Sequence, residues 1–243
     1  MCKMQKPDAQ NPRHVAIILD GNRRFAKRLM IKPWMGHEWG KKKVAKLLDW
    51  CVELGIKELT LYAFSVENFN RPKEEFDYIM KLFRESFKEL EGNKKLQEKN
   101  SKLGVKVRFL GRLAMFPDDI QAMMREIIKK TASNSGLVVN LCMAYGGRHE
   151  IADAARRIAL DVEKGRLSTS DVNEETIKRY LYMPDEPDII IRTGGEQRLS
   201  GFLLYQSSYS ELFFLGKMWP EFEKKDLVRV IEDFRQRQRR FGR

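Results

Sequence analysis

A cluster of residues suited to binding a metal-bound phosphate follows the first apolar run of the chain. The run His14–Leu19 predicts a buried strand, and it ends at Asp20-Gly21-Asn22-Arg23-Arg24. A carboxylate can hold a hard cation such as Mg²⁺, and guanidinium groups offer forked donors to a phosphate. A glycine lets the backbone come close to such a ligand. An exposed hairpin turn is the alternative interpretation, because Asp-Gly is a common turn pair.

Three further predicted strands end in residues of the same kind. The second strand runs into residues 65–72, where a hydroxyl, amides and an arginine precede a proline that starts a helix. The fourth ends in residues 145–148 and the fifth in residues 192–200. Because ligands bind beyond the carboxyl ends of strands in open parallel sheets, these ends together predict one anion site. Its glycines and arginines are Gly21, Gly146, Gly147, Gly194, Gly195, Arg23, Arg24, Arg71, Arg148, Arg192 and Arg198.

Short apolar strands alternate with helical segments, which predicts an α/β fold with a single, mainly parallel β-sheet flanked by helices. The predicted strands are His14–Leu19, Leu59–Phe64, Val105–Leu110, Leu137–Met143 and Asp188–Arg192. The predicted helices are Glu38–Leu54, one that begins at Pro72, Pro117–Thr131, Glu150–Glu163, Glu174–Leu181 and Glu223–Arg239. One domain over residues 1–243 is expected, with residues 1–12 flexible and Glu91–Leu103 a mobile excursion.

The composition is that of a soluble globular protein, with 42% hydrophobic and 33% charged residues. The polar N-terminus and the lack of an apolar run near 20 residues predict a cytoplasmic location. Three widely spaced cysteines fit a reducing compartment without a disulfide framework, and three scattered histidines argue against structural zinc.

The net charge of +12 calls for anionic partners. The charge concentrates in residues 23–28, 41–43 and 235–243. A nucleic-acid binder is one alternative, but it rests on charge alone, without basic–aromatic interleaving or a binding motif. We therefore expect no nucleic-acid partner and assign the excess to solubility or to loose association with a membrane surface.

The motifs also resemble, in the same order and with compatible spacing, those of the cis-prenyltransferases, which make undecaprenyl diphosphate and related polyprenyl diphosphates. The resemblance runs from His14 to the C-terminus. It is carried by His-Val-Ala-Ile-Ile-Leu-Asp20-Gly-Asn, Gly36-His37, Tyr62-Ala-Phe-Ser65, Glu67-Asn68, Asn70-Arg71-Pro72, Tyr145-Gly-Gly-Arg148, Ile191-Arg-Thr-Gly-Gly-Glu196 and Arg240-Phe-Gly242.

This resemblance implies condensation of isopentenyl diphosphate onto an allylic prenyl diphosphate with a new cis double bond. It further implies Mg²⁺ dependence, a homodimer, an apolar tunnel for the growing chain and a product used in lipid carrier synthesis. A noncatalytic partner subunit of a heteromeric member is the alternative. Such subunits usually lose the metal aspartate or the Arg-Thr-Gly-Gly-Glu segment, and this chain keeps both.

The resemblance assigns roles residue by residue. Asp20 would coordinate Mg²⁺, and Glu211 matches a second acidic metal contact, although it could also be an exposed glutamate opening the strand Leu212–Leu215. Asn68 is associated with proton removal, and because a neutral amide is a poor base it would orient the oxygen that accepts the proton. The allylic diphosphate would contact Gly21, Asn22, Arg23, Arg24, Phe25, Lys32 and His37. The isopentenyl diphosphate would contact Arg192, Arg198, Leu199 and Ser200. The loop that positions the reacting carbons would be formed by Ser65, Val66, Glu67, Phe69 and Arg71.

Some positions depart from the family pattern. Phe25 and Phe69 replace tryptophans common in bacterial members, and Gln197 replaces a frequent histidine. Pro33 stands where the family often carries an arginine, so Lys32 is expected to substitute as a point charge. The expected tunnel lining is Phe76, Ile79, Met80, Phe83, Phe87, Leu137, Val139, Leu141 and Met143, although such a stripe also suits an ordinary core. Phe83 or Phe87 is expected to limit product length.

Overall fold

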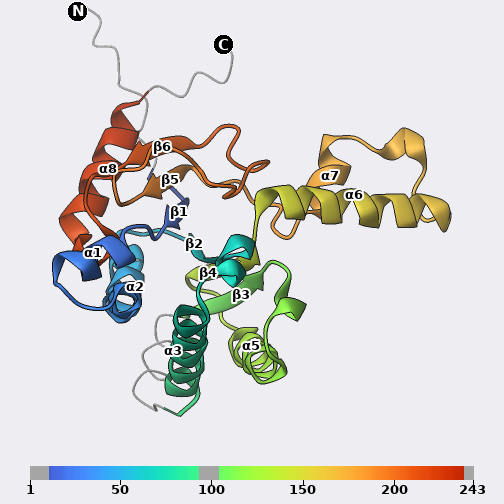
Figure 1. Cartoon of the computed structure of the whole chain (residues 1–243). Coiled ribbons are helices and arrows are strands. Elements are labelled where there is room, and N and C mark those ends of the chain that lie inside the picture. Colours follow the sequence, from blue (N-terminus) through green and yellow to red (C-terminus); the bar gives the residue numbers. More distant parts are fainter. Residues whose placement is uncertain (1–10, 93–103, 238–243) are drawn as a thin grey trace, which may run out of the picture.

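Six parallel strands form one sheet in the order β3-β4-β2-β1-β5-β6 (Figure 1). The structure is a computed structural model and describes residues 11–92 and 104–237. The strands are β1 (His14–Ile18), β2 (Glu58–Ser65), β3 (Lys106–Leu110), β4 (Val138–Tyr145), β5 (Ile189–Arg192) and β6 (Glu211–Phe214). The predicted fold class is confirmed, and the five predicted strands differ from the observed ones by one or two residues at their ends.

The helices follow the predicted order along the chain. They are α1 (Asn22–Arg28), α2 (Gly36–Glu53), α3 (Lys73–Gly92), α5 (Asp118–Thr131), α6 (Gly147–Glu163), α7 (Glu174–Tyr180) and α8 (Lys224–Gln236). α2 ends as its sequence predicts: Gly55 takes the left-handed conformation (φ 76°), and the next amide, on Ile56, bonds back to the Cys51 carbonyl oxygen. α1 was not predicted, because its residues were interpreted as a phosphate-binding strand end and a run of positive charge. The expected flexible terminus and the excursion after α3 lie mostly outside the described residues.

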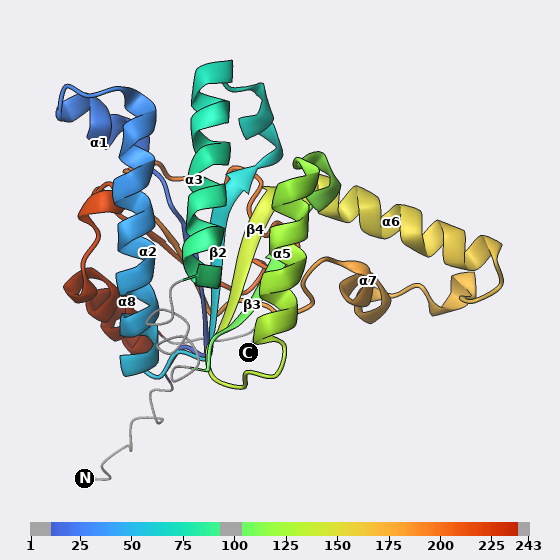
Figure 2. The ribbon, with the colours of Figure 1, turned by 90° about the horizontal axis from the view of Figure 1, so that it is seen from below.

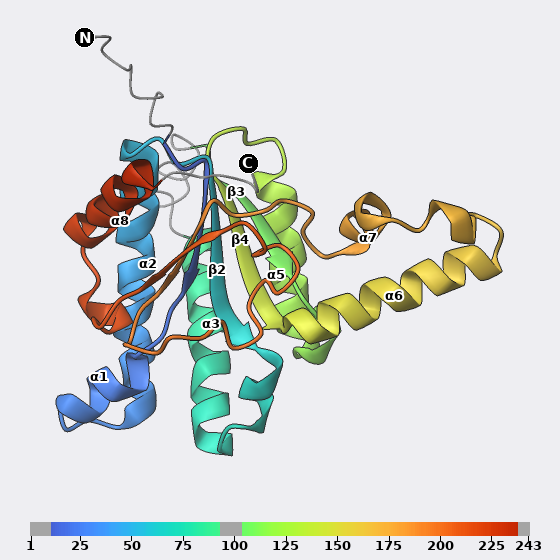
Figure 3. The same ribbon diagram turned by 90° about the horizontal axis from the view of Figure 1, so that it is seen from above.

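Both faces of the sheet are covered, but by different kinds of structure. On one face lie α8, α2, α3 and α5, side by side along the strands (Figures 2 and 3). Their buried side chains meet alternate strand residues such as Ile17 and Leu61. The opposite face, which includes Ala16 and Ile190, packs mainly against irregular segments that contribute Met183 and Phe202. None of the helices in residues 11–92 and 104–237 is long and apolar enough to cross a membrane.

Helices α6 and α7 project from the body of the molecule as an arm (Figures 1–3). The base of this arm is fixed by Asp153 of α6, which accepts two hydrogen bonds from the Arg112 guanidinium at 2.8 and 2.9 Å. The Tyr182 hydroxyl donates a third bond to the same carboxylate. These bonds join α6 to the loop after β3 and to the segment that leads into β5.

Protonation of Asp153 is expected to loosen this joint. Hydrogen bonds from Arg112 lower the pKa of Asp153 from 3.8 to about 2, so its stabilising effect is complete above the ordinary pKa. The stabilisation by the ionised Asp153 carboxylate is lost as the pH falls from 3.8 through about 2. Asp153→Asn should therefore lower the free energy of unfolding at neutral pH, and its difference from wild type should shrink over that acidic range. Urea unfolding at several pH values measures this, and a difference independent of pH would contradict it.

Candidate active site

The carboxyl ends of β1 and β5 bring Asp20 and the 192–200 segment together. Register pairs Ile18 with Arg192, and Asp20 follows two residues beyond β1. Gly194 makes this approach possible, since it has a left-handed backbone (φ 87°) and no side chain. A Cβ there would lie 2.6 Å from the Arg24 guanidinium and 3.3 Å from the Asp20 carboxyl carbon. The loops therefore pack closely only with glycine at this position.

Arg192 is the most buried arginine of the site, with 6% of its side chain exposed. Its Nη2 donates to Asp20 Oδ2 at 2.8 Å, and its Nη1 donates to Ser200 Oγ at 2.8 Å and to the Arg198 carbonyl oxygen. Its Nε is buried and has no hydrogen-bond partner within the described residues. Ser200 itself has a left-handed backbone (φ 50°), which non-glycine residues seldom adopt outside constrained sites. The site thus holds a buried cation with one donor still unsatisfied.

Two more arginines lie around this centre at the protein surface. Arg24 lies 3.3 Å from Asp20 and 3.4 Å from Glu196, and 43% of its side chain is exposed. Arg198 pairs with Glu196 at 2.6 Å and does not line the cavity described below. These cations are solvated and able to turn toward a polyanion, whereas Arg192 is fixed.

A second cluster of charged and polar side chains comes from α1, α2, α3 and the loop before α3. The buried carboxylate of Glu75 lies 2.7 Å from Arg71, 3.7 Å from Arg23 and 3.8 Å from His37. The neighbouring His37 ring, and then the charge of Arg71, hold the pKa of Glu75 below its usual range. Burial lowers the pKa of His37, so its ring is neutral at pH 7. One carboxylate therefore orients three side chains that were predicted to bind phosphate.

The loop after β2 presents Ser65, Val66, Glu67 and Asn68 as a short 3₁₀ turn. The backbone N–H of Ser65 donates to Asn68 Oδ1 at 3.0 Å, so the amide NH₂ of Asn68 is the group left for a ligand. A donor of this kind can orient an oxygen but cannot accept a proton. Phe69 of the same loop packs against Phe64 with ring centroids 5.1 Å apart and does not line the cavity.

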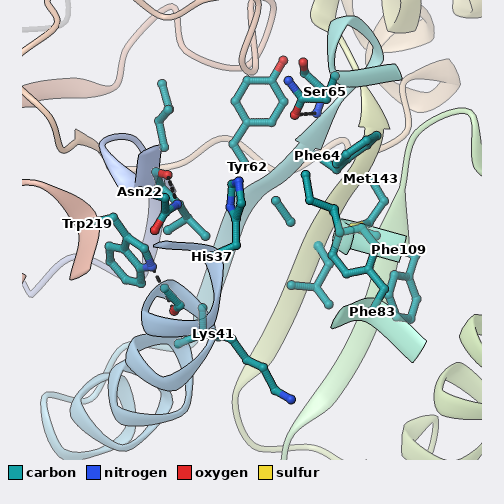
Figure 4. Close-up of a pocket in the computed structure, with 18 of the residues that line it drawn as sticks. Asn22, His37, Lys41, Tyr62, Phe64, Ser65, Phe83, Phe109, Met143 and Trp219 are labelled. Atoms are coloured by element: carbon teal, nitrogen blue, oxygen red, sulfur yellow. Dashed lines mark hydrogen bonds between the residues drawn. The ribbon is translucent and has the colours of Figure 1, made fainter. Parts of the chain in front are cut away.

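A cavity of about 900 Å³ begins at these charged groups and continues along the sheet between α2 and α3. In Figure 4, His37, Asn22 and Trp219 lie on one side of it, and Phe64, Phe83, Phe109 and Met143 lie on the other. Its polar end includes Asp20, Asn68, Arg71, Arg148, Arg192 and Ser200. Its apolar end includes Val44, Leu48, Phe87, Val105, Ile127, Val139 and Leu141. One continuous space therefore joins an anion-binding mouth to an apolar interior.

Most of the predicted tunnel stripe lines this cavity, namely Ile79, Phe83, Phe87, Val139, Leu141 and Met143. Phe76, Met80 and Leu137 do not line it. Two polar contacts join α2 to α3 beside the cavity. Lys41 pairs with Glu89 at 3.0 Å, and the Tyr78 hydroxyl donates to Glu38 at 2.5 Å.

Some predicted site residues lie elsewhere. Register places Glu211 at the amino end of β6, opposite Ile189, and it pairs with Arg237 at 2.5 Å. At about 3.3 Å per residue this is roughly 16 Å along the strands from Asp20, so the two carboxylates cannot share a metal within one chain. Within this chain the Glu211 carboxylate is paired with Arg237 and is not beside Asp20, and its metal role stays a prediction. Lys32 is exposed, with its ammonium 5.3 Å from the Trp34 ring, and does not line the cavity.

Other predicted residues act through packing. Gly21 has a left-handed backbone (φ 105°), and a Cβ there would lie 2.8 Å from Met218. Phe25 is buried against Trp39, with ring centroids 5.7 Å apart. Leu199 packs in the cluster on the opposite face of the sheet.

The sequence analysis missed residues that the fold brings to the site. Glu75 stands four residues after Arg71, a spacing that signals an ion pair on one helix face. Trp219 lines the cavity, its indole N–H donates to the Gly40 carbonyl at 3.0 Å, and its backbone N–H donates to the Asp20 carbonyl at 2.9 Å. Trp219 follows β6. It could have been predicted if the carboxyl end of β6 had been considered together with the other strand ends.

Asp20 is the candidate metal ligand at the mouth of the cavity. No group of three or more His, Cys, Asp or Glu side chains suited to a metal occurs within residues 11–92 and 104–237. Asp20 lines the cavity with 29% of its side chain exposed. A single carboxylate of this kind fits Mg²⁺, which commonly binds one or two carboxylates and completes its shell with water and substrate phosphates.

A family model described as "Putative undecaprenyl diphosphate synthase" matches residues 18–242. The chain belongs to this family. It is 51% identical over 234 residues to the tritrans,polycis-undecaprenyl-diphosphate synthase (geranylgeranyl-diphosphate specific) of Thermococcus kodakarensis, covering 96% of this chain and 87% of that protein. It is 45% identical over 240 residues to an isoprenyl transferase of Thermus thermophilus, covering 96% of this chain and 89% of the relative.

A solved structure agrees with this assignment. Lavandulyl diphosphate synthase from Lavandula x intermedia, crystallised with dimethylallyl diphosphate, superposes with a TM-score of 0.86. It is 35% identical in sequence, and the match covers 96% of this chain and 99% of the other. The chain is therefore a prenyltransferase of the cis type, and the family resemblance and fold inferred from the sequence are confirmed.

Replacing Glu75 with glutamine should misorient Arg71 and His37 in this cis-prenyltransferase. We expect kcat/KM with prenyl diphosphates to fall about 10- to 100-fold, because small displacements of positioning groups have effects of that size. Steady-state kinetics and a thermal melt separate this effect from unfolding. Glu74→Gln, on the adjacent exposed position, is the matched control. Equal kinetics for the two variants would show that Glu75 does not position the site.

Proposed function

We propose that this chain is a Mg²⁺-dependent polyprenyl diphosphate synthase that condenses isopentenyl diphosphate units onto an allylic prenyl diphosphate with new cis double bonds. One observation carries the proposal: a cavity of about 900 Å³ has an arginine-rich mouth and an apolar interior. A diphosphate on a hydrocarbon chain has the same two parts in the same order. In each condensation the allylic C–O bond breaks, a C–C bond forms, and a proton leaves the isopentenyl unit.

Asp20 is proposed to hold the Mg²⁺. The bound ion would supply charge that stabilises the leaving diphosphate. In the described structure Asp20 accepts hydrogen bonds from Arg192 and from its neighbouring amide, on Gly21. These bonds hold the carboxylate in one orientation, and a carboxylate oxygen is a ligand suited to a hard cation.

The two diphosphates are proposed to bind on either side of Asp20. Asn22, Arg23, Arg24 and His37 would hold the allylic diphosphate, with the amide of Gly21 contributing a backbone donor. Arg192, Ser200 and, after turning away from Glu196, Arg198 would hold the isopentenyl diphosphate. The free Nε of Arg192 and the fork of its Nη atoms are suited to that anion.

The reacting carbons would lie beside the loop of Ser65, Glu67, Asn68 and Arg71. Asn68 donates rather than accepts, so its proposed role is to orient the diphosphate oxygen or water that takes the proton. Lys32 and Phe25 are not proposed as direct contacts, because the Lys32 ammonium lies over the Trp34 ring and the Phe25 ring is buried against Trp39.

Geranylgeranyl diphosphate is the proposed allylic primer, since the Thermococcus relative is named as specific for it. The chain is further proposed to act as a homodimer in the cytoplasm, to bind no nucleic acid, and to supply a lipid carrier pathway. The family resemblance supports the dimer.

The decisive experiment supplies labelled isopentenyl diphosphate with either geranylgeranyl or farnesyl diphosphate, with and without Mg²⁺. Butanol-extractable polyprenyl products should form only with the metal and preferentially with geranylgeranyl diphosphate. Chain-length analysis of the extract identifies the product. Absence of turnover with both primers would overturn the proposal, and light scattering tests the dimer.

Asp20→Ala should lower kcat by about 10³-fold, because it removes the metal contact from the transition state. The fold should survive, since the carboxylate is partly exposed rather than part of the core. Circular dichroism checks the fold, and Asp118→Ala, at an exposed position of α5, is the control. Near-normal turnover by the Asp20 variant would refute the metal role.

Phe83→Ala or Phe87→Ala should lengthen the products, because each removes a ring from the cavity wall. The two rings stack with centroids 6.1 Å apart, and Phe87 also contacts Phe109. Phe76→Ala removes the same group from the same helix but outside the cavity, so it is the matched control. Thin-layer chromatography of the dephosphorylated products gives the lengths. If all three variants gave products of the same chain length, the proposal that Phe83 or Phe87 limits product length would be wrong.

A further inference from the structure

One segment of this protein carries a large excess of positive charge. Residues 23–46 contain nine lysines and arginines and a single acid, in a chain whose net charge is +12. That acid, Glu38, accepts a hydrogen bond from Tyr78. The segment forms α1, a 3₁₀ turn over Pro33–Met35, and the first half of α2. α1 lies at the periphery of the molecule (Figures 1 and 2), beside the mouth of the cavity.

The same segment exposes large apolar side chains. Met30 is 94% exposed, Trp39 is 49% exposed, and Leu29 and Met35 are 43% and 38% exposed. Met30 stands at the tip of the turn after α1 with a left-handed backbone (φ 56°), a conformation that methionine seldom adopts. Backbone bonds from Met30 to the Lys27 carbonyl and from Ile31 to the Ala26 carbonyl fix this turn. The turn therefore holds a methionine out in solvent, where it contributes little to the core.

Two cation–ring contacts lie beside this tip. The Lys42 ammonium lies 5.9 Å from the Trp39 ring, and the Arg28 guanidinium lies 5.5 Å from the Phe25 ring. Trp39 and Phe25 pack edge to face, which joins α1 and α2 into one surface. Exposed methionine, leucine and tryptophan among lysines match a bilayer interface, where apolar groups enter the acyl boundary and cations meet anionic headgroups.

We propose that this surface, formed by Lys27, Leu29, Met30, Met35, Trp39 and Lys42, docks on an anionic lipid bilayer. A nucleic acid would also be attracted by the positive charge. Its bases stack on flat aromatic side chains, however, so the exposed aliphatic residues would have no contact to make with it. Docking here would place the mouth of the apolar cavity next to the lipid surface. This proposal does not depend on the proposed synthase activity, because it concerns binding of the protein to a bilayer in the absence of substrate.

Co-sedimentation of the full chain with vesicles tests the proposal without any prenyl substrate. Binding is expected to vesicles of phosphatidylcholine with phosphatidylglycerol, and not to phosphatidylcholine alone. It should weaken as the salt concentration rises to about 0.5 M, where charges are screened over a few ångströms. Failure to bind anionic vesicles overturns the proposal and leaves the synthase activity untouched.

Paired variants locate the surface. Leu29→Ser with Met30→Ser, and separately Lys27→Gln with Lys42→Gln, should each weaken vesicle binding by about tenfold or more. The matched controls are Met115→Ser with Leu160→Ser, and Lys73→Gln with Lys129→Gln, at exposed positions outside the segment. Thermal melts confirm that each variant folds. Equal losses in test and control pairs would overturn the proposed surface, as would tighter binding to an RNA homopolymer that depends on the same residues.

Discussion

The ion pair between Arg192 and Asp20, at 2.8 Å, is the contact on which the rest of the site depends. A guanidinium that is 6% exposed is stable only where most of its donors are bonded, and here a carboxylate, a hydroxyl and a carbonyl bond two of its nitrogens. The third nitrogen, Nε, is buried and unbonded within the described part of the chain. This arrangement fixes the carboxylate that is suited to a metal, and it keeps one strong donor ready for an anion.

The parallel sheet makes this pair possible. It also gives the continuous cavity one charged end and one apolar end. Strands that run in one direction bring their loops to one edge, so arginines from separate segments meet there. The strands below that edge are apolar on both faces because both faces are covered. α2 and α3 stand on the same face with the cavity between them and two polar contacts beside it. A charged mouth above an apolar interior is a direct consequence of this arrangement.

Several site assignments from sequence depended on how side chains pack, and these needed the structure. Phe25 and Phe69 were expected near substrate, yet both rings pack against other rings away from the cavity. Lys32 turns toward Trp34 at the surface. Glu75 was missed although it orients Arg71, His37 and Arg23, because a glutamate in the first turn of a helix usually serves only the helix dipole.

The sequence by itself determined the α/β class, the strand positions and the edge at which Asp20, Arg71 and Arg192 gather. These follow from local order: apolar runs form strands, and residues just after parallel strands share one edge. The tertiary structure alone decided which of those residues touch. Glu211 follows Ser200 by eleven residues, yet the register of β6 against β5 puts it at the opposite end of the sheet. Register and rotamer are set by packing between segments far apart in the chain, and no short stretch of sequence contains that information.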